Sequence, residues 1–493
     1  MTSAAPLFGS RALGVLDELR VPYELEPGGS DGGVWEHLSA GSQSRALHWW
    51  SRAAAAEEGH YTVDGIPVWG QVAPERAVSE FAGTLAGRWA PSLAVLDAEG
   101  RRHSSVWRSA DGGAILPFDP DELASNLRSE RYRELQAPTG SAVKAAARRG
   151  YYALRPLMPR RLQIGLRRAF ARVQARTEFP RWPVEPALHD LVGFVLSLAA
   201  DAAGEPLPYL APWPCGYEWA LVLTHDVETA SGRDAIERVR AVEESAGFRS
   251  SWNLVPERYS VDDELVRRLG EAGCEVGVHG LRHDGRDLES LKTLRRRLPE
   301  MRRWADRWGS VGFRAPATHR VWDWMPMLGF DYDSSYPDTD PFEPISGGCC
   351  SWLPFFNRDL VELPITLPQD HTVFVILRRD ESLWLEKAEH LRRHGGLALL
   401  ITHPDYMLAD GPLRAYERLL DAYRDDASAW KALPRDVSAW WRRRAETSLV
   451  RTGSVWRALG PGADEASIVF VHPGEAEAAT LAVGPVVAAA REG

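Results

Sequence analysis

Two carboxylates follow a run of apolar residues in the segment ALVLTHDVE, at Asp226 and Glu228. Successive side chains of a β-strand point to opposite faces, so residues two apart share a face. Both carboxylates therefore lie on one face of the expected strand, and His225 and Val227 lie on the other. A carboxylate at such a place can bind a metal ion or accept a proton.

Two histidines follow another apolar run: His279 and His283 in HGLRH, after CEVGV. Two histidines and one carboxylate are a common ligand set for a divalent metal ion that keeps open positions for water and substrate. The spacing H-x-x-x-H carries little weight alone, because a single histidine at a strand end is usually a structural group. Its weight comes from its place among the other polar residues.

Three more polar side chains stand where expected strands end. Arg314 ends SVGFR, Asp333 ends GFDYD and His403 ends LALLITH. In parallel α/β sheets and barrels, ligand chemistry gathers at the carboxyl ends of the strands. We therefore expect these groups to lie in one site with the carboxylates and the histidine pair.

The elements that would position these residues alternate from Glu218 onward. Apolar runs typical of buried strands are followed by amphipathic runs typical of helices. The expected strands cover residues 220–226, 250–255, 274–280, 310–316, 329–335, 360–366 and 396–404, and the expected helices cover 233–247, 261–273 and 288–308, the last interrupted at Pro299. Repeated strand–helix units with short loops predict an α/β fold with a parallel sheet, open or closed into a barrel.

The order of these motifs resembles the polysaccharide deacetylase family, over residues 220–444. The matching motifs are THDVE, HGLRHD, GFRAP, GFDYDSSYP and LLITHP. Members of this family remove acetyl groups from amino sugars in chitin, peptidoglycan and exopolysaccharides. The resemblance implies that the catalytic domain is a distorted (β/α) barrel.

Residue by residue, the resemblance implies separate roles within one metal site. Glu228, His279 and His283 match the metal ligands of the family. Asp226 is similar to the base that activates metal-bound water, and Arg314 resembles the arginine that holds this carboxylate. The implied cofactor is one divalent metal ion, zinc in the first place, with cobalt, manganese or nickel as alternatives.

The resemblance also implies a proton donor. His403 is similar to the histidine that protonates the leaving amine, and Asp333 would orient it. This division agrees with the chemistry of amide hydrolysis, which needs a proton acceptor for the attacking water and a separate donor for a poor leaving group.

Two motifs depart from the family pattern. The first motif usually has two adjacent aspartates, the second of which binds the metal. Val227 occupies that second place here, so the ligand role passes to Glu228, which is one methylene longer. In the second motif, Gly280 stands where Ser or Thr is usual and Asp284 where Pro is common. If Glu228 cannot reach the ion, Asp226 would bind it and no separate base would remain.

The chain has 493 residues, more than one hydrophobic core usually serves, so we expect several domains. Residues 1–135 combine helical and strand-like runs and predict a smaller α/β domain that precedes the barrel. Residues 136–215 begin basic, end rich in proline and predict a linker or strap. Residues 216–445 would form the barrel, and residues 446–493 a C-terminal extension.

Charge is unevenly distributed along the chain. The formal net charge is −10, yet residues 135–177 hold no acid and ten bases. Within them, residues 161–176 place apolar side chains at helical spacing between arginines. Two alternatives are open for this segment: peripheral contact with an anionic membrane, or packing of its apolar stripe on the acidic body. The acidic remainder argues against nucleic-acid binding.

The sequence shows no feature of export. No apolar run is long enough to span a bilayer, and the amino terminus lacks the basic and apolar regions of a signal peptide. A cytoplasmic protein is expected, with a membrane-peripheral one as the alternative. Cys215, Cys274, Cys349 and Cys350 show no C-x-x-C spacing, so reduced thiols are expected.

The residues and the resemblance predict a hydrolase that removes an acetyl group from an N-acetylated sugar or polysaccharide precursor, with a carbohydrate as its partner. Two alternatives are open: a catalytically weak homologue that binds carbohydrate or a partner protein, and a deacetylase of a small non-polymeric amide or ester. Residues 336–352 either cap the site and contact substrate or form a surface excursion.

Overall fold

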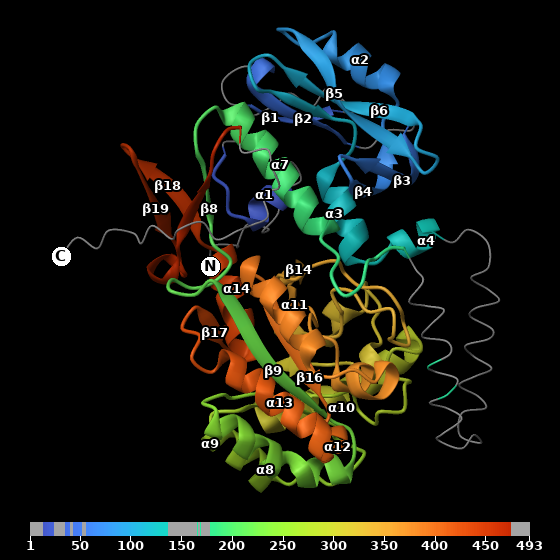
Figure 1. Ribbon diagram of the computed structural model, residues 1–493, viewed down its shortest axis with the longest axis vertical. Helices are drawn as coiled ribbons and strands as arrows, with labels where there is room; N and C mark the ends of the chain where they lie inside the picture. Colours follow the sequence, from blue (N-terminus) through green and yellow to red (C-terminus); the bar gives the residue numbers. More distant parts are fainter. Residues whose placement is uncertain are drawn as a thin grey trace. The chain divides into compact units, whose positions relative to one another are not determined.

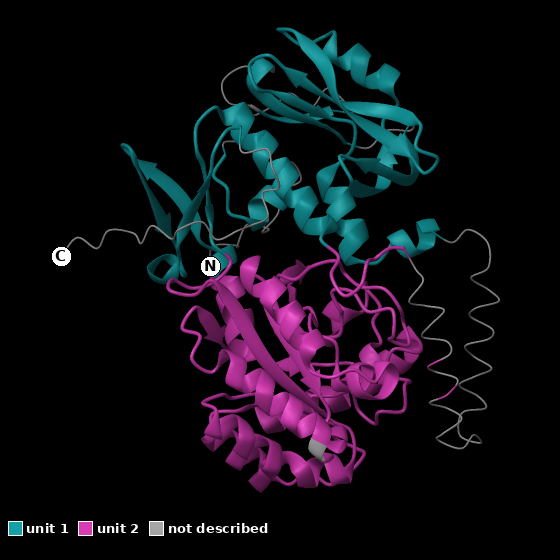
Figure 2. Ribbon diagram, in the orientation of Figure 1, with its two compact units in different colours: residues 1–141, 186–211, 444–493 teal, residues 142–185, 212–443 magenta. Residues whose placement is uncertain are grey.

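The computed structural model describes residues 13–23, 35–39, 43–51, 56–136, 165, 168 and 178–474. The chain divides into two compact units, each assembled from separate segments (Figure 2). Unit 1 comprises residues 1–141, 186–211 and 444–493, and unit 2 comprises residues 142–185 and 212–443.

Unit 1 contains a sheet of seven strands in the order β1-β2-β7-β6-β5-β3-β4 (Figure 1). Its strands are β1 (Trp35–Ser39), β2 (Ala46–Trp50), β3 (Glu57–Val63), β4 (Ile66–Val72), β5 (Trp89–Asp97), β6 (Arg102–Ser109) and β7 (Ala114–Leu116). Neighbouring strands run antiparallel, except for the parallel pair β2 and β7. Helix α2 (Glu75–Ala82) packs Val78 and Ala82 against Trp50 and Ile115 of the sheet.

Later segments of the chain complete unit 1. Helix α7 (Ala187–Ala203) is mostly apolar and contacts α3 (Pro120–Arg128) and β2. Strand β8 (Leu207–Leu210) pairs with β20 (Ile468–Val471) close to the end of the described chain. The expected linker, residues 136–215, therefore includes a buried helix and a strand, and the expected extension, residues 446–493, contributes a strand to the first unit. The sequence-based boundaries differ because only long-range pairing brings these segments together.

The remaining helices of unit 1 are α1 (Gly14–Glu18) and α4 (Tyr132–Gln136), and a two-stranded ribbon joins β18 (Ser448–Thr452) to β19 (Val455–Leu459). Arg444, at the end of α14 (Pro434–Ala445), connects three of its segments. The guanidinium donates to the carbonyl oxygens of Ala211 at 2.9 Å, Leu210 at 2.6 Å and Glu18 at 2.6 Å. It is buried, and burial lowers its pKa to about 9.

Unit 2 contains a sheet of nine strands in the order β14-β15-β13-β12-β11-β10-β9-β16, with β17 also paired to β9. The strands are β9 (Trp219–Val227), β10 (Ser251–Leu254), β11 (Glu275–Val278), β12 (Gly312–Phe313), β13 (Tyr332–Asp333), β14 (Phe355–Asn357), β15 (Leu360–Glu362), β16 (Leu397–Thr402) and β17 (Ala429–Lys431). All pairs are parallel except β14 with β15. This is the expected parallel α/β arrangement.

The sheet of unit 2 curls, and an irregular segment joins its two ends. Beyond β15, the backbone N–H groups of Thr366 and Leu367 donate to the carbonyl oxygen of Leu399 in β16, at 3.2 and 3.0 Å. The hydroxyl of Thr366 donates to the carbonyl oxygen of Leu397 at 2.6 Å. A few hydrogen bonds thus replace a regular ladder at this seam.

Helices connect the strands of unit 2. They are α8 (Ala230–Ser245), α9 (Asp263–Glu271), α10 (Leu291–Trp308), α11 (Ser382–Arg393), α12 (Pro404–Met407), α13 (Asp410–Tyr423) and α14. Helix α10 begins at the cap Ser290, whose side chain accepts the N–H of Thr293, and ends at Gly309 with φ of 63°. The expected interruption at Pro299 is wrong, because α10 continues through it. Pro299 is exposed, where water can solvate the carbonyl left without a donor.

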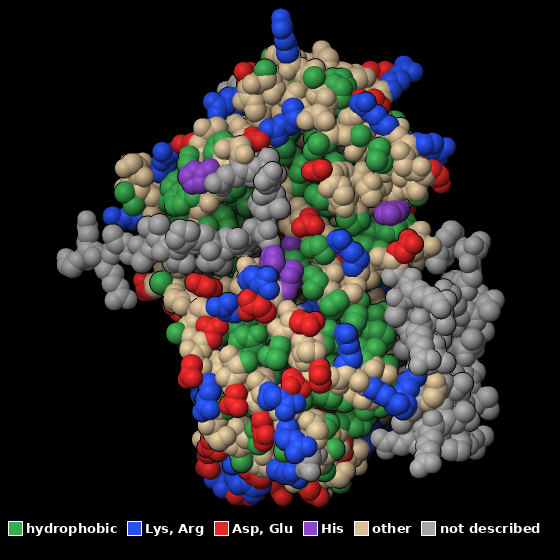
Figure 3. Space-filling model, viewed as in Figure 1, with side chains coloured by type: hydrophobic (Ala, Val, Ile, Leu, Met, Phe, Trp, Pro, Cys, Tyr) green, Lys and Arg blue, Asp and Glu red, His purple; other side chains and the backbone are tan. Residues whose placement is uncertain are grey.

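The surface of unit 2 mixes charges of both signs. On α8 and α9, at the lower end of the view, acidic and basic side chains alternate (Figure 3). Arg240 pairs with Glu237 at 2.8 Å and with Glu244 at 2.9 Å, along one face of α8. In the described part of the chain, no helix is both long and apolar enough to cross a membrane. None of the four cysteines is in a disulfide bond, in line with the expected reduced thiols.

Of the basic segment 161–176, the structure describes only Gly165 and Arg168. The guanidinium of Arg168 donates to the carbonyl oxygen of Val375 at 3.0 and 2.8 Å. This one contact is of the kind expected if the segment packs on the protein. The other residues of the segment lie outside the described residues, so membrane contact stays a prediction.

Replacing Arg444 tests how unit 1 is held together. Arg444→Ala removes a charged donor from three backbone carbonyls, and we expect the free energy of unfolding to fall by about 3 kcal/mol. Urea unfolding, followed by circular dichroism, measures it. Arg457→Ala, at an exposed position of β19, should change stability by less than about 0.5 kcal/mol. Equal stability of the two variants would contradict the prediction.

Candidate metal centre and active site

Polar side chains meet at the carboxyl edge of the parallel strands in unit 2. Asp226 and Glu228 stand at the end of β9, and His279 directly follows β11. Arg314 follows β12, and His403 follows β16. The parallel pairing of these strands brings their ends to the same edge, which is where the sequence predicts the site.

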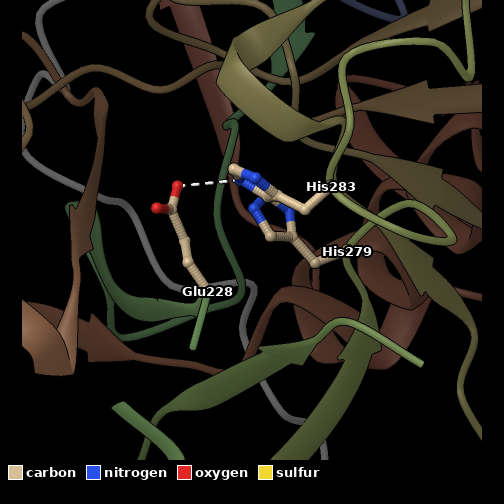
Figure 4. A group of neighbouring side chains, drawn as sticks. All are labelled: Glu228, His279 and His283. Atoms are coloured by element: carbon tan, nitrogen blue, oxygen red, sulfur yellow. Dashed lines mark ion pairs between the residues drawn. The ribbon is translucent and has the colours of Figure 1, made fainter. Parts of the chain in front are cut away.

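Glu228, His279 and His283 form a compact group (Figure 4). One ligand atom from each lies within 4.8 Å of the other two. Nε2 of His283 is 2.9 Å from Oε1 of Glu228, and the two imidazole rings are 5.0 Å apart between centroids. Within the described ranges, no other His, Cys, Asp or Glu side chains form such a group. These three residues could hold one metal ion.

The nitrogen atoms of both histidines fit a cation. Nδ1 of His279 lies 3.0 Å from the carbonyl oxygen of Arg314 and must donate to it, because a carbonyl only accepts. Burial lowers the pKa of His279 to about 4, so the ring is neutral at pH 7 with its lone pair on Nε2. Nε2 of His279 is buried without a hydrogen-bond partner, and Nε2 of His283 faces the carboxylate of Glu228 at 2.9 Å. A cation would bind both atoms and satisfy Nε2 of His279, which is otherwise costly to bury.

Glu228 reaches the histidines in spite of the valine in the preceding position. Val227 is fully buried and belongs to the opposite face of β9, so an acid there would point away from the histidines. Burial alone would raise the pKa of Glu228, but His283, His403 and His279 together hold it well below its usual range. Glu228 is therefore an ionised carboxylate, close enough to His279 and His283 to share one metal ion with them.

Asp226 lies beside this group and is held by other partners. Its carboxylate accepts a hydrogen bond from the side chain of Asn253 at 2.9 Å and pairs with Arg314 at 3.3 Å. Its Oδ2 is 3.8 Å from Nε2 of His279. Burial alone would raise the pKa of Asp226, but His279, Arg314 and His403 together lower it by more, so the pKa lies below its usual value. An ionised carboxylate in this place can accept a proton.

Arg314 is itself fixed from two strands. Its Nη2 donates to the hydroxyl of Thr224 in β9 at 3.3 Å and to the hydroxyl of Ser334 at 3.0 Å. The guanidinium is buried, so its charge acts on Asp226 with little screening by water. Arg314 thus pairs with Asp226, which is the carboxylate that the resemblance implies it holds.

His403 faces the ligand group from β16. Its Nε2 is 3.7 Å from Oε1 of Glu228. Asp370 holds the other side of the residue: Oδ1 is 2.7 Å from Nδ1, and Oδ2 accepts the backbone N–H of His403 at 2.7 Å. Burial alone lowers the pKa of His403, but Asp370, Glu228 and Asp226 raise it to about 10. A protonated imidazole there can donate a proton from Nε2.

The carboxylate that orients His403 is therefore Asp370 and not Asp333, which corrects the expectation. Asp333 accepts hydrogen bonds from the hydroxyl of Ser335 at 2.7 Å and from its N–H at 2.9 Å. The same hydroxyl accepts the N–H of Ala315 at 2.8 Å, next to Arg314. Asp333 thus supports the loop that carries Arg314. The irregular segment with Thr366 and Leu367 lies between β13 and β16, and Asp370 follows it in the chain.

Two residues of the site, Asn253 and Asp370, escape the sequence reasoning. Asn253 lies opposite Asp226 in the register of β10 and β9, and a polar residue near the end of the strand SWNL was the available signal. Asp370 lies between the irregular seam and a π-helical turn, His371–Leu377, so no strand end marks it.

Residues 336–352 do not form a surface excursion. Apart from 344–346, which are partly exposed, they are buried. The carboxylate of Glu343 accepts hydrogen bonds from the hydroxyl of Thr318, at 3.1 Å, and from the side-chain amide of Gln369. Thr318 lies in the loop after Arg314, and Gln369 precedes Asp370. The segment therefore packs against two loops that carry site residues, and its contact with substrate stays a prediction.

Comparison with solved structures finds similar chains for about half of this one. A Mycobacterium smegmatis protein named as a polysaccharide deacetylase is 21% identical, with a TM-score of 0.41 over 50% of this chain and 98% of that chain. The PuuE allantoinase is 17% identical, with a TM-score of 0.38 over 47% and 92% of the two chains. A Pseudomonas aeruginosa PAO1 protein, also named as a polysaccharide deacetylase, is 17% identical, with a TM-score of 0.39 over 47% and 93%.

Two of these three similar structures are thus named as polysaccharide deacetylases and one as an allantoinase. No protein-family model matches it, and no curated protein sequence does. The roles of its site residues therefore depend on the geometry described above.

The ligand assignment predicts how metal content responds to substitution. Protein stripped with a chelator and titrated with Zn²⁺ should bind one equivalent. His279→Ala, His283→Ala and Glu228→Ala should each weaken binding by at least about 100-fold, because each removes a ligand. Asp226→Asn should keep the metal. Loss of the metal in Asp226→Asn together with its retention in Glu228→Ala would show that Asp226 is the ligand.

Proposed function

We propose that unit 2 hydrolyses the amide bond of an N-acetylated sugar or polysaccharide precursor, releasing acetate and the free amine. The observation that carries this proposal is the position of two proton-transfer groups beside different members of the ligand group. Oδ2 of Asp226 is 3.8 Å from Nε2 of His279, and Nε2 of His403 is 3.7 Å from Oε1 of Glu228. An acceptor and a donor thus stand next to one candidate metal centre.

The donor set of Glu228, His279 and His283 suits a divalent ion that keeps open positions, with zinc in the first place. When bound, such an ion polarises the amide carbonyl and makes water a nucleophile at neutral pH. Nε2 of His279, Nε2 of His283 and the carboxylate of Glu228 would hold it.

Asp226 takes the proton of the attacking water. Its low pKa keeps it ionised at neutral pH, and the hydrogen bond from Asn253 and the ion pair with Arg314 hold the carboxylate in one orientation. These fixed partners are organised before substrate binds, so the carboxylate needs no rearrangement during the reaction.

His403 gives a proton to the leaving nitrogen. An amine leaves poorly unless it is protonated as the C–N bond breaks. In the protonated imidazole of His403, Nδ1 donates to Asp370, and the second proton is on Nε2, on the side of the ligand group. Asp226 thus takes one proton as water adds to the carbonyl carbon. His403 gives one proton to the nitrogen as the C–N bond breaks.

The sugar amide is preferred as substrate because the order of the motifs resembles the family that acts on acetylated amino sugars. A small non-polymeric amide or ester would use the same groups, and it remains the alternative within this class. The complete set of Asp226, His403 and the ligand group favours an enzyme over a catalytically weak binding homologue.

Catalysis can be separated from metal binding by substitution of the proton-transfer groups. The zinc-loaded protein is incubated with N-acetylated nucleotide sugars, lipid-linked sugars, oligosaccharides and small amides, and loss of the acetyl mass is followed by mass spectrometry. Asp226→Asn and His403→Ala should lower kcat by about 1000-fold, because each removes one proton-transfer step. Both should retain zinc. Full activity in either variant would contradict the proposed roles.

Asp370 should affect kcat through His403. Asp370→Asn removes the negative charge that raises the pKa of His403, so less of the imidazole is protonated and able to act as an acid, and we expect kcat to fall by about 100-fold or more. KM should change little, since Asp370 lies behind the imidazole. Asp359→Asn, at an exposed turn, is the matched control and should leave kcat unchanged. A similar kcat for both variants would exclude the orienting role of Asp370.

A further inference from the structure

The loop that carries both histidines has an unfavourable backbone. His283 has φ of 53°, Gly280 φ of 62° and Gly285 φ of 73°. Positive φ suits glycine but costs free energy for a residue with a side chain such as histidine. Something outside the loop must therefore hold it in this conformation.

The two histidines of the loop are held to different degrees. The backbone N–H of His279 donates to the carbonyl oxygen of Leu254 in β10 at 2.8 Å, and its ring donates to the carbonyl oxygen of Arg314. His283 lies further from the sheet. One guanidinium N–H of the exposed Arg258 donates to its carbonyl oxygen at 3.1 Å. The position of His283 thus depends more on the fold of the loop itself.

Two carboxylates of the loop turn back on it. Oδ2 of Asp287 accepts the backbone N–H of Leu281 at 3.1 Å, and Oδ1 of Asp284 accepts the backbone N–H of Arg286 at 3.1 Å. A Cβ on Gly280 would lie 2.4 Å from Oδ2 of Asp287, which closes the space for any larger residue at this position. The carboxylates therefore fill the inside of the loop.

Arg297 of α10 holds both carboxylates at once. Its Nη1 donates to Asp284 at 2.7 Å and to Asp287 at 2.6 Å, and its Nη2 donates to Asp284 at 2.6 Å. Only 8% of the Arg297 side chain and 4% of that of Asp287 are exposed. A planar guanidinium can make several such bonds in fixed directions, which an ammonium group cannot.

We propose that Arg297 is a positioning residue of the metal centre. Through Asp284 and Asp287 it holds the His279–Gly285 loop in the conformation that brings Nε2 of His283 within reach of Glu228. The inference rests on the proposed function, because it assumes that Glu228, His279 and His283 hold a metal ion. The metal affinity of this site then depends on Arg297, whose hydrogen bonds are to Asp284 and Asp287 and not to Glu228, His279 or His283.

The test measures the metal site directly in the full chain. Zinc affinity is measured by competition with a chromophoric chelator, and the visible absorption of the Co²⁺-loaded protein reports the number and geometry of the ligands. Arg297→Met should bind zinc about 10- to 100-fold more weakly, as expected for loss of a group that orients a ligand, and should show an altered Co²⁺ spectrum. Arg297→Lys should fall between Arg297→Met and the wild type.

The control is Arg296→Met, which makes the same change at the neighbouring, exposed position of α10. It should match the wild type in both readouts. Asp284→Asn, whose side chain is 34% exposed, removes one partner of Arg297 without a buried cavity and should weaken zinc binding by about 3- to 10-fold. It also reports on the proposal if Arg297→Met does not fold.

The outcomes separate this proposal from the proposed function. A wild-type protein that binds no zinc or cobalt contradicts both. A wild type that binds the metal, with Arg297→Met and Asp284→Asn of equal affinity and unchanged Co²⁺ spectrum, overturns only the role of Arg297. Weaker binding in these two variants, with Arg296→Met unchanged, supports it.

Discussion

The alternation of side chains along β9 is the constraint on which the site depends. All nine residues of this strand are buried, and hydrogen bonds to β10, β16 and β17 fix its register. One face ends in Asp226. The other carries His225, which bonds to Thr402 at 2.7 Å and Glu243 at 2.5 Å and serves the core. Because the period is two, a slip by one residue would exchange these groups and remove the acid from the site.

The charges gathered at this edge explain why the site suits a cation. The carboxylates of Asp226 and Asp370 are buried and that of Glu228 is half-buried, and Arg314 and a protonated His403 bring positive charge to them. Charges in a buried site are stable only when they are paired and their hydrogen bonds are made. A divalent ion between Glu228 and the two histidines would complete the balance. The same electrostatics that favours the metal keeps Asp226 ionised and His403 protonated, which are the states that the proposed reaction needs.

The sequence predicts those parts of the site that follow regular strands. Apolar runs with a polar end are local signals, so the sequence alone places Asp226, His279, Arg314 and His403 at one edge of the sheet. It does not place Asp370 there, because this residue follows a seam whose few hydrogen bonds come from segments far apart in the chain. For the same reason, the sequence assigns the orientation of His403 to Asp333, which ends a strand, and not to Asp370. The mixed composition of unit 1 also escapes prediction, since the pairing of β8 with β20 joins residues more than half the chain apart.

Arg297 shows a signal that sequence reasoning can use but that is easily passed over. It is one of three consecutive arginines in LRRRL, which as a run indicates only a solvated helix face. The buried residues of α10 are Leu294, Arg297, Met301, Ala305 and Trp308, at successive spacings of three or four. Arg297 therefore lies on the face of α10 that packs on the protein, whereas Arg295 and Arg296 are exposed. A cation on such a face needs acids to pair with, and Arg297 finds them in Asp284 and Asp287, which follow His279 and His283 in the chain. Helical periodicity thus distinguishes the arginine that supports the candidate metal centre from those that meet water.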